Sequence, residues 1–297
     1  MKFEMKNRLK PCLAVSVAIM AIALVMSMMG MGMNLGIDFT GGTLMTYNMG
    51  AEFSVDDVNA ALAECGIADA QIAKTGEENK QVQIRISDVE NTDDLRSQLE
   101  EKLAVNYPDI EYVDIVRVGA VVGGELINNA IKSLTIAAVL MLIYIAFRFD
   151  LYSGIAAVIG LAHDVAIMIS FVVILRGFIR VETTFIAALL TIVGYSINNT
   201  IIIFDRIREN AHKNGVRHLP LEQIVNISVT ESLPRTLNTT VTTLLTVVTL
   251  YILGVDSIKQ FALPLIIGML AGTYSANMIN GYVWAALLGW RKKAKKA

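Results

Sequence analysis

Long runs of residues without charge alternate with short charged segments along most of the chain. Runs that are free or nearly free of charge cover residues 11–37, 133–147, 151–175, 183–204, 236–255 and 261–290. A helix needs about 20 apolar residues to cross the ~30 Å hydrocarbon core of a bilayer, because it rises ~1.5 Å per residue. The pattern therefore predicts six transmembrane helices.

A different pattern separates the first run from the second. Residues 41–50, 69–87 and 111–119 favour strands, with two strands in the middle segment, and residues 54–65 and 91–105 favour helices. Ser54 is a candidate N-cap for the first of these helices. The resulting order βαββαβ predicts a small α+β domain with a ferredoxin-like fold.

Together the two patterns predict an α-helical polytopic membrane protein, with six transmembrane helices and the small α+β domain between helices 1 and 2. The first run is too long for the core of a signal peptide, so it is expected to be retained. The segment "LEQIVNISVTESL" (221–233) favours an amphipathic helix lying at the membrane interface. The expected divisions are 1–37 (N-terminus and first helix), 38–125 (the α+β domain), 126–290 (helices 2 to 6) and 291–297 (a basic tail).

Composition and charge agree with a membrane protein and predict its orientation. The 297 residues are 54% hydrophobic with a mean hydropathy of +0.54, which is rare for a soluble domain. Lys and Arg of the short loops gather in the N-terminus, in the loop after the fourth run and in the tail. The positive-inside rule then predicts that both termini are cytoplasmic and that residues 38–125 lie outside the cytoplasm. The net charge of −2 says nothing about nucleic acid, but the sequence has no basic patch beyond the membrane flanks, so no nucleic-acid partner is expected.

The sequence lacks the signatures of common catalytic sites. It holds three histidines and contains neither HExxH nor GxSxG, which argues against a zinc or serine hydrolase. It also lacks GxxxxGK[ST], so no ATP site of that type is expected. Cys12 and Cys65 are expected on opposite sides of the membrane, which argues against a disulfide between them. We therefore expect no enzyme activity, no cofactor and no metal site.

Three polar residues lie where the apolar pattern makes them costly. Asp164 falls near the middle of the third run, where a carboxylate costs roughly 2.5–3.5 kcal/mol. Ion handling is one interpretation, and a structural hydrogen bond, for example to His163, is the other. Asn198 and Asn199 in the fourth run lie either near an ion path or in hydrogen bonds between helices.

Charged residues and glycines mark two ends of the predicted helices. Asp205, Arg206 and Arg208 follow the fourth run, where they indicate the cytoplasmic boundary or a contact with a partner or gate. Asp205 is expected to pair with Arg208 or Arg235. A structural hinge between the first helix and the first strand is expected at Gly36, Asp38, Gly41 and Gly42.

Five segments together resemble the SecF family of bacterial protein export, within the resistance-nodulation-division superfamily. The resemblance covers nearly the whole chain in the same order. It implies a subunit in the bacterial inner membrane that pairs with SecD and associates with the SecYEG channel and the SecA motor. It also implies use of an ion gradient, usually of protons, to help an unfolded polypeptide across the bilayer. The segments are "LGIDFTGGTLM" (35–45), "VGAVVGGELINNAIKSL" (118–134), "HDV" (163–165), "GYSINNTIIIFDRIREN" (194–210) and "SLPRTLNTTVTTLLTV" (232–247).

One position departs from the family pattern. Where the family carries an acidic residue on the proton path, this chain has Asn199, and an amide does not exchange protons near neutral pH. Three explanations stay open: SecD supplies the titrating acid, Asp164 replaces it, or the coupling ion is Na⁺, for which amide oxygens are suitable ligands. Arg235 matches the family's arginine that acts with the carboxylates, and snorkelling to the interface is its alternative.

Two other functions compete with protein export. A small-molecule or lipid exporter of the same superfamily usually has twice as many helices and larger outside domains. A purely scaffolding subunit would have no need of Asp164 inside the membrane.

Overall fold

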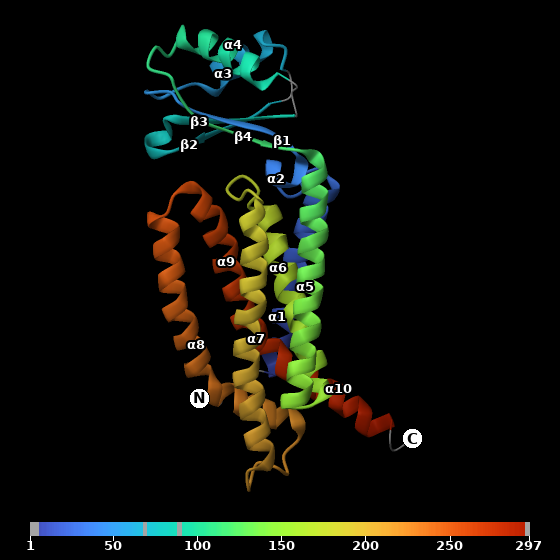
Figure 1. Ribbon diagram of the computed structural model, residues 1–297. Helices are drawn as coiled ribbons and strands as arrows, with labels where there is room; N and C mark the ends of the chain where they lie inside the picture. Colours follow the sequence, from blue (N-terminus) through green and yellow to red (C-terminus); the bar gives the residue numbers. More distant parts are fainter. Residues whose placement is uncertain (1–5, 68–69, 88–90, 295–297) are drawn as a thin grey trace.

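The computed structural model describes residues 6–67, 70–87 and 91–294, and it shows a helical bundle beside a small domain (Figure 1). Within these residues, six stretches are long and apolar enough to cross a membrane, which confirms the predicted number. The protein is therefore a multi-pass membrane protein. Residues 1–5 and 295–297, which belong to the expected terminal segments, lie outside the described part. The six stretches are Leu9–Met28, Val122–Arg148, Leu151–Ile174, Thr183–His212, Leu221–Leu253 and Ser257–Arg291.

The helices of the bundle differ strongly in how much of their surface they bury. The membrane-spanning window is 56% buried in α6 and 44% in α7, but only 6% in α5 and 11% in α1. The centre of the bundle is therefore formed by α6, α7 and α9, and polar groups on their inner faces are shielded from lipid. The helices are α1 (Lys6–Met28), α5 (Ala120–Arg148), α6 (Leu151–Ile174), α7 (Thr183–His212), α8 (Leu221–Leu253), α9 (Asp256–Ser275), the π-turn η2 (Ala276–Asn280) and α10 (Gly281–Ala294).

Helix α1 ends earlier than the uncharged run that predicts it. The run continues to residue 37, but the helix stops at Met28. Gly30 adopts a φ of +79°, its N–H donates to the Ser27 carbonyl, and the N–H of Met31 donates to the Met26 carbonyl at 2.9 Å. This pair of bonds is the Schellman motif, which ends helices at a glycine. The apolar residues that follow form an irregular link and the short helix α2 (Ile37–Thr40).

The segment 221–233 is helical as expected but is not a separate helix, and its position at the membrane interface stays a prediction. It forms the first turns of α8, which continues without a break through Pro234 to Leu253. A proline inside a helix removes one hydrogen bond and bends the helix rather than always ending it. Figure 1 shows that α8 turns at its lower end toward α7.

The small domain contains a four-stranded sheet covered on one face by two helices. Neighbouring strands in the order β2-β3-β1-β4 are all antiparallel. The predicted cap is confirmed, because the Ser54 hydroxyl accepts a hydrogen bond from the N–H of Asp56 at 3.2 Å. In Figure 1, α3 and α4 cover the face of the sheet that points away from the bundle. The elements are β1 (Gly42–Asn48), α3 (Val55–Glu64), β2 (Gln71–Thr75), η1 (Glu77–Asn79), β3 (Gln81–Ile86), α4 (Thr92–Ala104) and β4 (Glu111–Val118).

Candidate functional site

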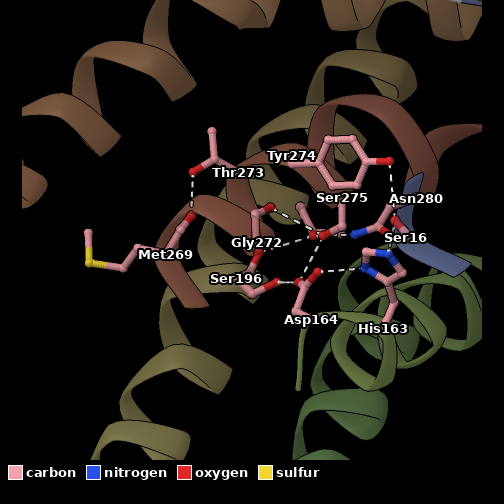
Figure 2. Close-up of polar contacts among 11 residues, drawn as sticks. Ser16, His163, Asp164, Ser196, Met269, Gly272, Thr273, Tyr274, Ser275 and Asn280 are labelled. Carbon is pink, nitrogen blue, oxygen red and sulfur yellow. Dashed lines mark hydrogen bonds and ion pairs between the residues drawn. The ribbon is translucent and has the colours of Figure 1, made fainter. Parts of the chain in front are cut away.

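Asp164 lies at the centre of the bundle, where α6, α7 and α9 meet. Its side chain is fully buried. Figure 2 shows that Oδ2 accepts hydrogen bonds from the hydroxyls of Ser196 on α7 and Ser275 on α9, the second at 2.8 Å. Oδ1 lies 3.1 Å from Nδ1 of the neighbouring His163. The carboxylate is therefore held by polar groups from three helices, which lowers the cost of placing it inside the membrane.

Glycines bring these helices close enough for the contacts to form. A Cβ at Gly272 of α9 would lie 3.0 Å from the Cβ of Ser196. A Cβ at Gly160, one turn before Asp164 on α6, would lie 2.0 Å from Oδ1 of Asn280. Small residues allow close helix packing in membranes. Larger residues at these two positions would separate the polar groups.

A second polar layer surrounds Asn199, which is also fully buried. Its Nδ2 donates to Oγ1 of Thr273 at 3.3 Å, and this hydroxyl lies 2.7 Å from that of Thr240 on α8. The Nδ2 of Asn280 donates to Oγ1 of Thr200 at 2.8 Å. The Oδ1 atoms of Asn199 and Asn280 are buried and accept no hydrogen bond from the described residues. A buried carbonyl oxygen without a donor is unfavourable, so each of these oxygens offers a position for a water or a small cation.

The structure does not bring the other two ion-path candidates into this layer. Asn198 lies on the exposed side of α7, because successive residues of a helix are rotated by ~100°. Arg235 is exposed on α8, one residue after Pro234. Of the four candidates, only Asp164 and Asn199 therefore face the interior of this chain.

Asp38 links the segment before the small domain to the bundle. Its Oδ2 accepts hydrogen bonds from the N–H and the Oγ1 of Thr183, at 2.8 and 2.7 Å. Thr183 is the first residue of α7, and Glu182 at the N-cap position makes no capping bond with its side chain. Asp38 therefore acts as a remote N-cap for the helix that carries Ser196 and Asn199.

The three glycines near Asp38 shape the turn that presents it. The N–H of Gly36 donates to the Val181 carbonyl at 2.7 Å, and a Cβ at Gly36 would lie 3.0 Å from that oxygen. Gly41 and Gly42 have φ values of +72° and +125°, which side chains disfavour. In this structure the segment is a turn with defined contacts, and its action as a hinge stays a prediction.

Substitution of Asp38 by alanine is expected to loosen the start of α7. Loss of an N-cap costs about 1 kcal/mol, and the effect should concentrate in the first turn of the helix. Faster hydrogen exchange of the Thr183 and Thr184 amides, measured by mass spectrometry in detergent, would report it. Asp38→Asn is the matched control, because asparagine caps helices about as well as aspartate. Equal exchange in the alanine variant and the unaltered protein would contradict the capping role.

Charged side chains are partly buried beside this turn. The Nη1 of Arg180 donates to Oε1 of Gln83 in β3 at 2.6 Å and lies 3.6 Å from Oε1 of Glu182. Burial lowers the pKa of Arg85 to about 10, and the nearby Arg180 acts in the same direction. Burial also raises the pKa of the Glu182 carboxyl. The sheet thus contacts the ends of the helices through charges that are incompletely hydrated.

The charged residues at the other end of α7 form exposed ion pairs. Asp205 was expected to pair with Arg208 or Arg235, but this was wrong. Its Oδ1 lies 3.3 Å from Nη2 of Arg148 on α5. The Nη1 of Arg208 donates to the carbonyl of Arg148 at 3.1 Å. Arg206 contacts Glu231 of α8 at 2.7 Å. Exposed pairs of this kind contribute little stability, so they position the helix ends rather than hold the bundle together.

Four residues of the intramembrane site escaped the sequence analysis. They are common residue types in membrane helices, and no spacing relates positions on three different helices. One usable signal was present, because one of the serines lies inside the segment "GYSINN", three residues before Asn199. The residues are Ser16, Ser196, Tyr274 and Ser275.

Comparisons with known proteins agree with this architecture. Residues 98–290 match the family described as "Protein export membrane protein SecD/SecF, C-terminal", and residues 27–49 match the "SecD/SecF GG Motif". The protein translocase subunit SecF of Thermobaculum terrenum is 34% identical, over 87% of this chain and 85% of its own length. The protein translocase subunit SecDF of Thermus thermophilus is 36% identical over 89% of this chain, which spans only 36% of that protein.

A solved structure leads to the same assignment. The crystal structure of SecDF from Thermus thermophilus, titled a translocon-associated membrane protein, superposes with a TM-score of 0.80 and 34% identity. The match covers 96% of this chain and 38% of that one. The chain therefore belongs to the SecD/SecF family of protein export membrane proteins, as a member of its SecF branch.

Proposed function

We propose that this protein is the SecF-type subunit of a membrane complex that uses an ion gradient to promote protein export. Its relatives are named protein translocase subunits, a transport role rather than a catalytic one. Family membership favours protein export over a small-molecule or lipid exporter. Ion coupling is inferred from the carboxylate of Asp164, which is fully buried between three helices. Ionisable groups inside a membrane usually serve ion or proton pathways.

SecD is the proposed partner within the membrane. In the SecDF relatives of Thermus thermophilus and Bacillus subtilis, this chain matches only about a third of a longer protein. The exposed faces of α7 and α8 also carry Asn198, Arg235, Asn238 and Thr242. Polar side chains inside a membrane are costly against lipid, so a partner helix is expected to cover them. SecD is then a possible source of the titrating acid that Asn199 cannot provide.

The proposed orientation places both termini in the cytoplasm and residues 38–125 outside it. The distribution of Lys and Arg supports this orientation. The alternation β1-α3-β2-β3-α4-β4 and the antiparallel order β2-β3-β1-β4 support the assignment of a ferredoxin-like fold to the small domain. Since α5 begins at Ala120, the domain proper ends near β4. An unfolded polypeptide, the SecYEG channel and the SecA motor are the further partners that we propose.

Gentle purification tests the proposed pairing. Tagged protein extracted from its native membrane in mild detergent is expected to retain SecD. Retention should fall when Arg235 and Asn238 are both replaced by leucine, because the partner's polar groups would lose their contacts. Leu24→Ala on the exposed side of α1 serves as the control and should retain SecD. A homo-oligomer that lacks SecD and transports small molecules would contradict the proposal.

A further inference from the structure

A chain of polar groups leads from Asp164 to the outer helix α1. The Nδ1 of His163 lies 3.1 Å from Oδ1 of Asp164, and its Nε2 lies 2.9 Å from the Oγ of Ser16 on α1. The Oγ of Ser16 lies 3.3 Å from the hydroxyl of Tyr274 on α9. Figure 2 shows these four side chains as one connected path. Three helices therefore contribute to it.

The hydrogen atoms of this path have one consistent arrangement when Asp164 is ionised. The carboxylate can only accept, so His163 donates through Nδ1–H, and in a neutral imidazole Nε2 is then an acceptor. Ser16 then donates to Nε2, and Tyr274 donates to the oxygen of Ser16. Every donor in the path points toward the carboxylate.

The other contacts of Asp164 do not offer an equivalent path. Ser196 and Ser275 direct their hydroxyl hydrogens to Oδ2. The hydroxyl of Ser275 also lies 3.3 Å from the carbonyl of Gly272, which has no hydrogen to pass on. An imidazole, by contrast, takes up and releases protons near neutral pH. Asp164 is fully buried, whereas the His163 side chain retains 11% exposure.

We propose that His163, Ser16 and Tyr274 form the path by which protons reach and leave Asp164. This inference rests on the proposed function, since it assumes that Asp164 titrates during ion coupling. His163 touches the titrating group directly, and Ser16 and Tyr274 act through it.

The proton balance of one transfer is simple. A proton that arrives at the hydroxyl of Tyr274 displaces the hydroxyl hydrogen of that residue to Ser16. Ser16 in turn gives its hydrogen to Nε2 of His163, which gives its Nδ1 hydrogen to Asp164. One proton has entered and the carboxylate has become a carboxylic acid, while the imidazole stays neutral in its other tautomer. The reverse sequence releases the proton.

Few titratable groups surround this path in the described part of the chain. Asp164 contacts His163 from its own helix, and Tyr274 of α9 has its ring centroid 5.9 Å from that of the imidazole. The thiol of Cys12 on α1 lies next to the Tyr274 hydroxyl. Cys12 is one turn from Ser16, toward the basic N-terminal segment. The path therefore ends beside Cys12, toward the end of α1 that the proposed orientation places in the cytoplasm.

Infrared difference spectroscopy on the full-length protein in lipid vesicles tests this path. The carboxyl band that disappears in Asp164→Asn identifies protonated Asp164, and its rise after a pH jump gives the rate of proton uptake. His163→Gln is expected to slow this rise by about a hundredfold or more, the usual scale for losing a positioned proton-transfer group.

Milder variants separate proton transfer from packing. Ser16→Ala and Tyr274→Phe should both slow the uptake of protons by Asp164. Ser170→Ala is the matched control, because among the described residues this buried serine of α6 bonds only to the Ala166 carbonyl. The rate in this variant should be unchanged. An unchanged rate in His163→Gln would overturn the proposal, and so would equal slowing in Ser170→Ala and Ser16→Ala.

Export assays distinguish this path from the proposed function. If Asp164 exchanges protons through His163 but gradient-driven export survives Asp164→Asn, the path stands and the proposed ion coupling fails. If export requires Asp164 but His163→Gln changes neither the exchange nor the export, the path fails and the coupling stands.

Discussion

Replacement of Asp164 by asparagine is expected to abolish the gradient-dependent part of protein export while the protein still folds and inserts. Asparagine has nearly the same shape, and its carbonyl oxygen can accept the hydrogen bonds that Ser196 and Ser275 donate. The tautomer of His163 can change to accept a hydrogen bond from the new amide. The packing of the three helices is therefore preserved, but the amide cannot take up a proton.

The measurement uses inverted membrane vesicles that contain the protein together with its native partners. Export of an unfolded client is followed under an imposed proton gradient, under a sodium gradient and without either. The asparagine variant should export at the rate seen without a gradient in each case. Ser170→Ala, a buried substitution on the same helix, should respond to the gradient as the unaltered protein does.

The two gradients also separate the explanations for Asn199. Export driven by protons and lost in Asp164→Asn would indicate that Asp164 replaces the acid expected at position 199. Export driven only by sodium would favour the unpaired amide oxygens of Asn199 and Asn280 as ligands. An unaltered gradient response in Asp164→Asn would contradict a coupling role for this residue. It would favour the explanation that SecD supplies the titrating acid.

Alanine at Gly123 is expected to destabilise the contact between α5 and α2 by about 1–3 kcal/mol, the usual cost of overpacking. A Cβ at this position would lie 2.3 Å from the carbonyl oxygen of Phe39. That atom belongs to the backbone of α2, so it cannot move aside as a side chain would. The strain should displace the turn that holds Asp38 against α7.

Gly124 provides a matched control for this prediction. It is the next residue of the same helix, and a Cβ there would meet no atom within 4 Å. Alanine at Gly124 should therefore be neutral or stabilise α5 by about 0.5–1 kcal/mol, because glycine is a poor helix former. Thermal unfolding in detergent and hydrogen exchange of residues 37–42 would compare the two variants. Equal melting temperatures and equal exchange would contradict the close approach.

The glycines show how far a sequence can indicate such contacts. The segment "VGGELINN" presents Gly123 and Gly124 as equivalent, and both lie just before the predicted second helix. Only the placement of α2 decides which one is in contact. Asn198 and Asn199 are a second example, because a rotation of ~100° between them puts one amide at the surface and the other in the core. The rotation of a helix about its axis depends on its neighbours, and α7 is apolar on most sides.

The pairings of charged residues were the least predictable feature. Asp205 was expected to pair with an arginine close in sequence or on the next helix, but it pairs with Arg148, 57 residues away on α5. Asp38 was singled out only as part of a hinge, and its contact with the start of α7, 145 residues away, was not foreseen. A short side chain pairs with whatever the packing of the backbone brings within ~3 Å, and that distance has no counterpart in local sequence patterns.

The six membrane helices and the order of strands and helices in the small domain can be predicted from residue patterns alone. Both follow from hydrophobic periodicity, because each residue's preference for lipid, core or water acts locally. Which polar residues meet inside the membrane depends instead on how the helices pack together. Ser16, Asp164, Ser196 and Ser275 come from four helices. Their contacts depend on the close packing that glycines such as Gly272 permit, and that packing is a property of the whole bundle.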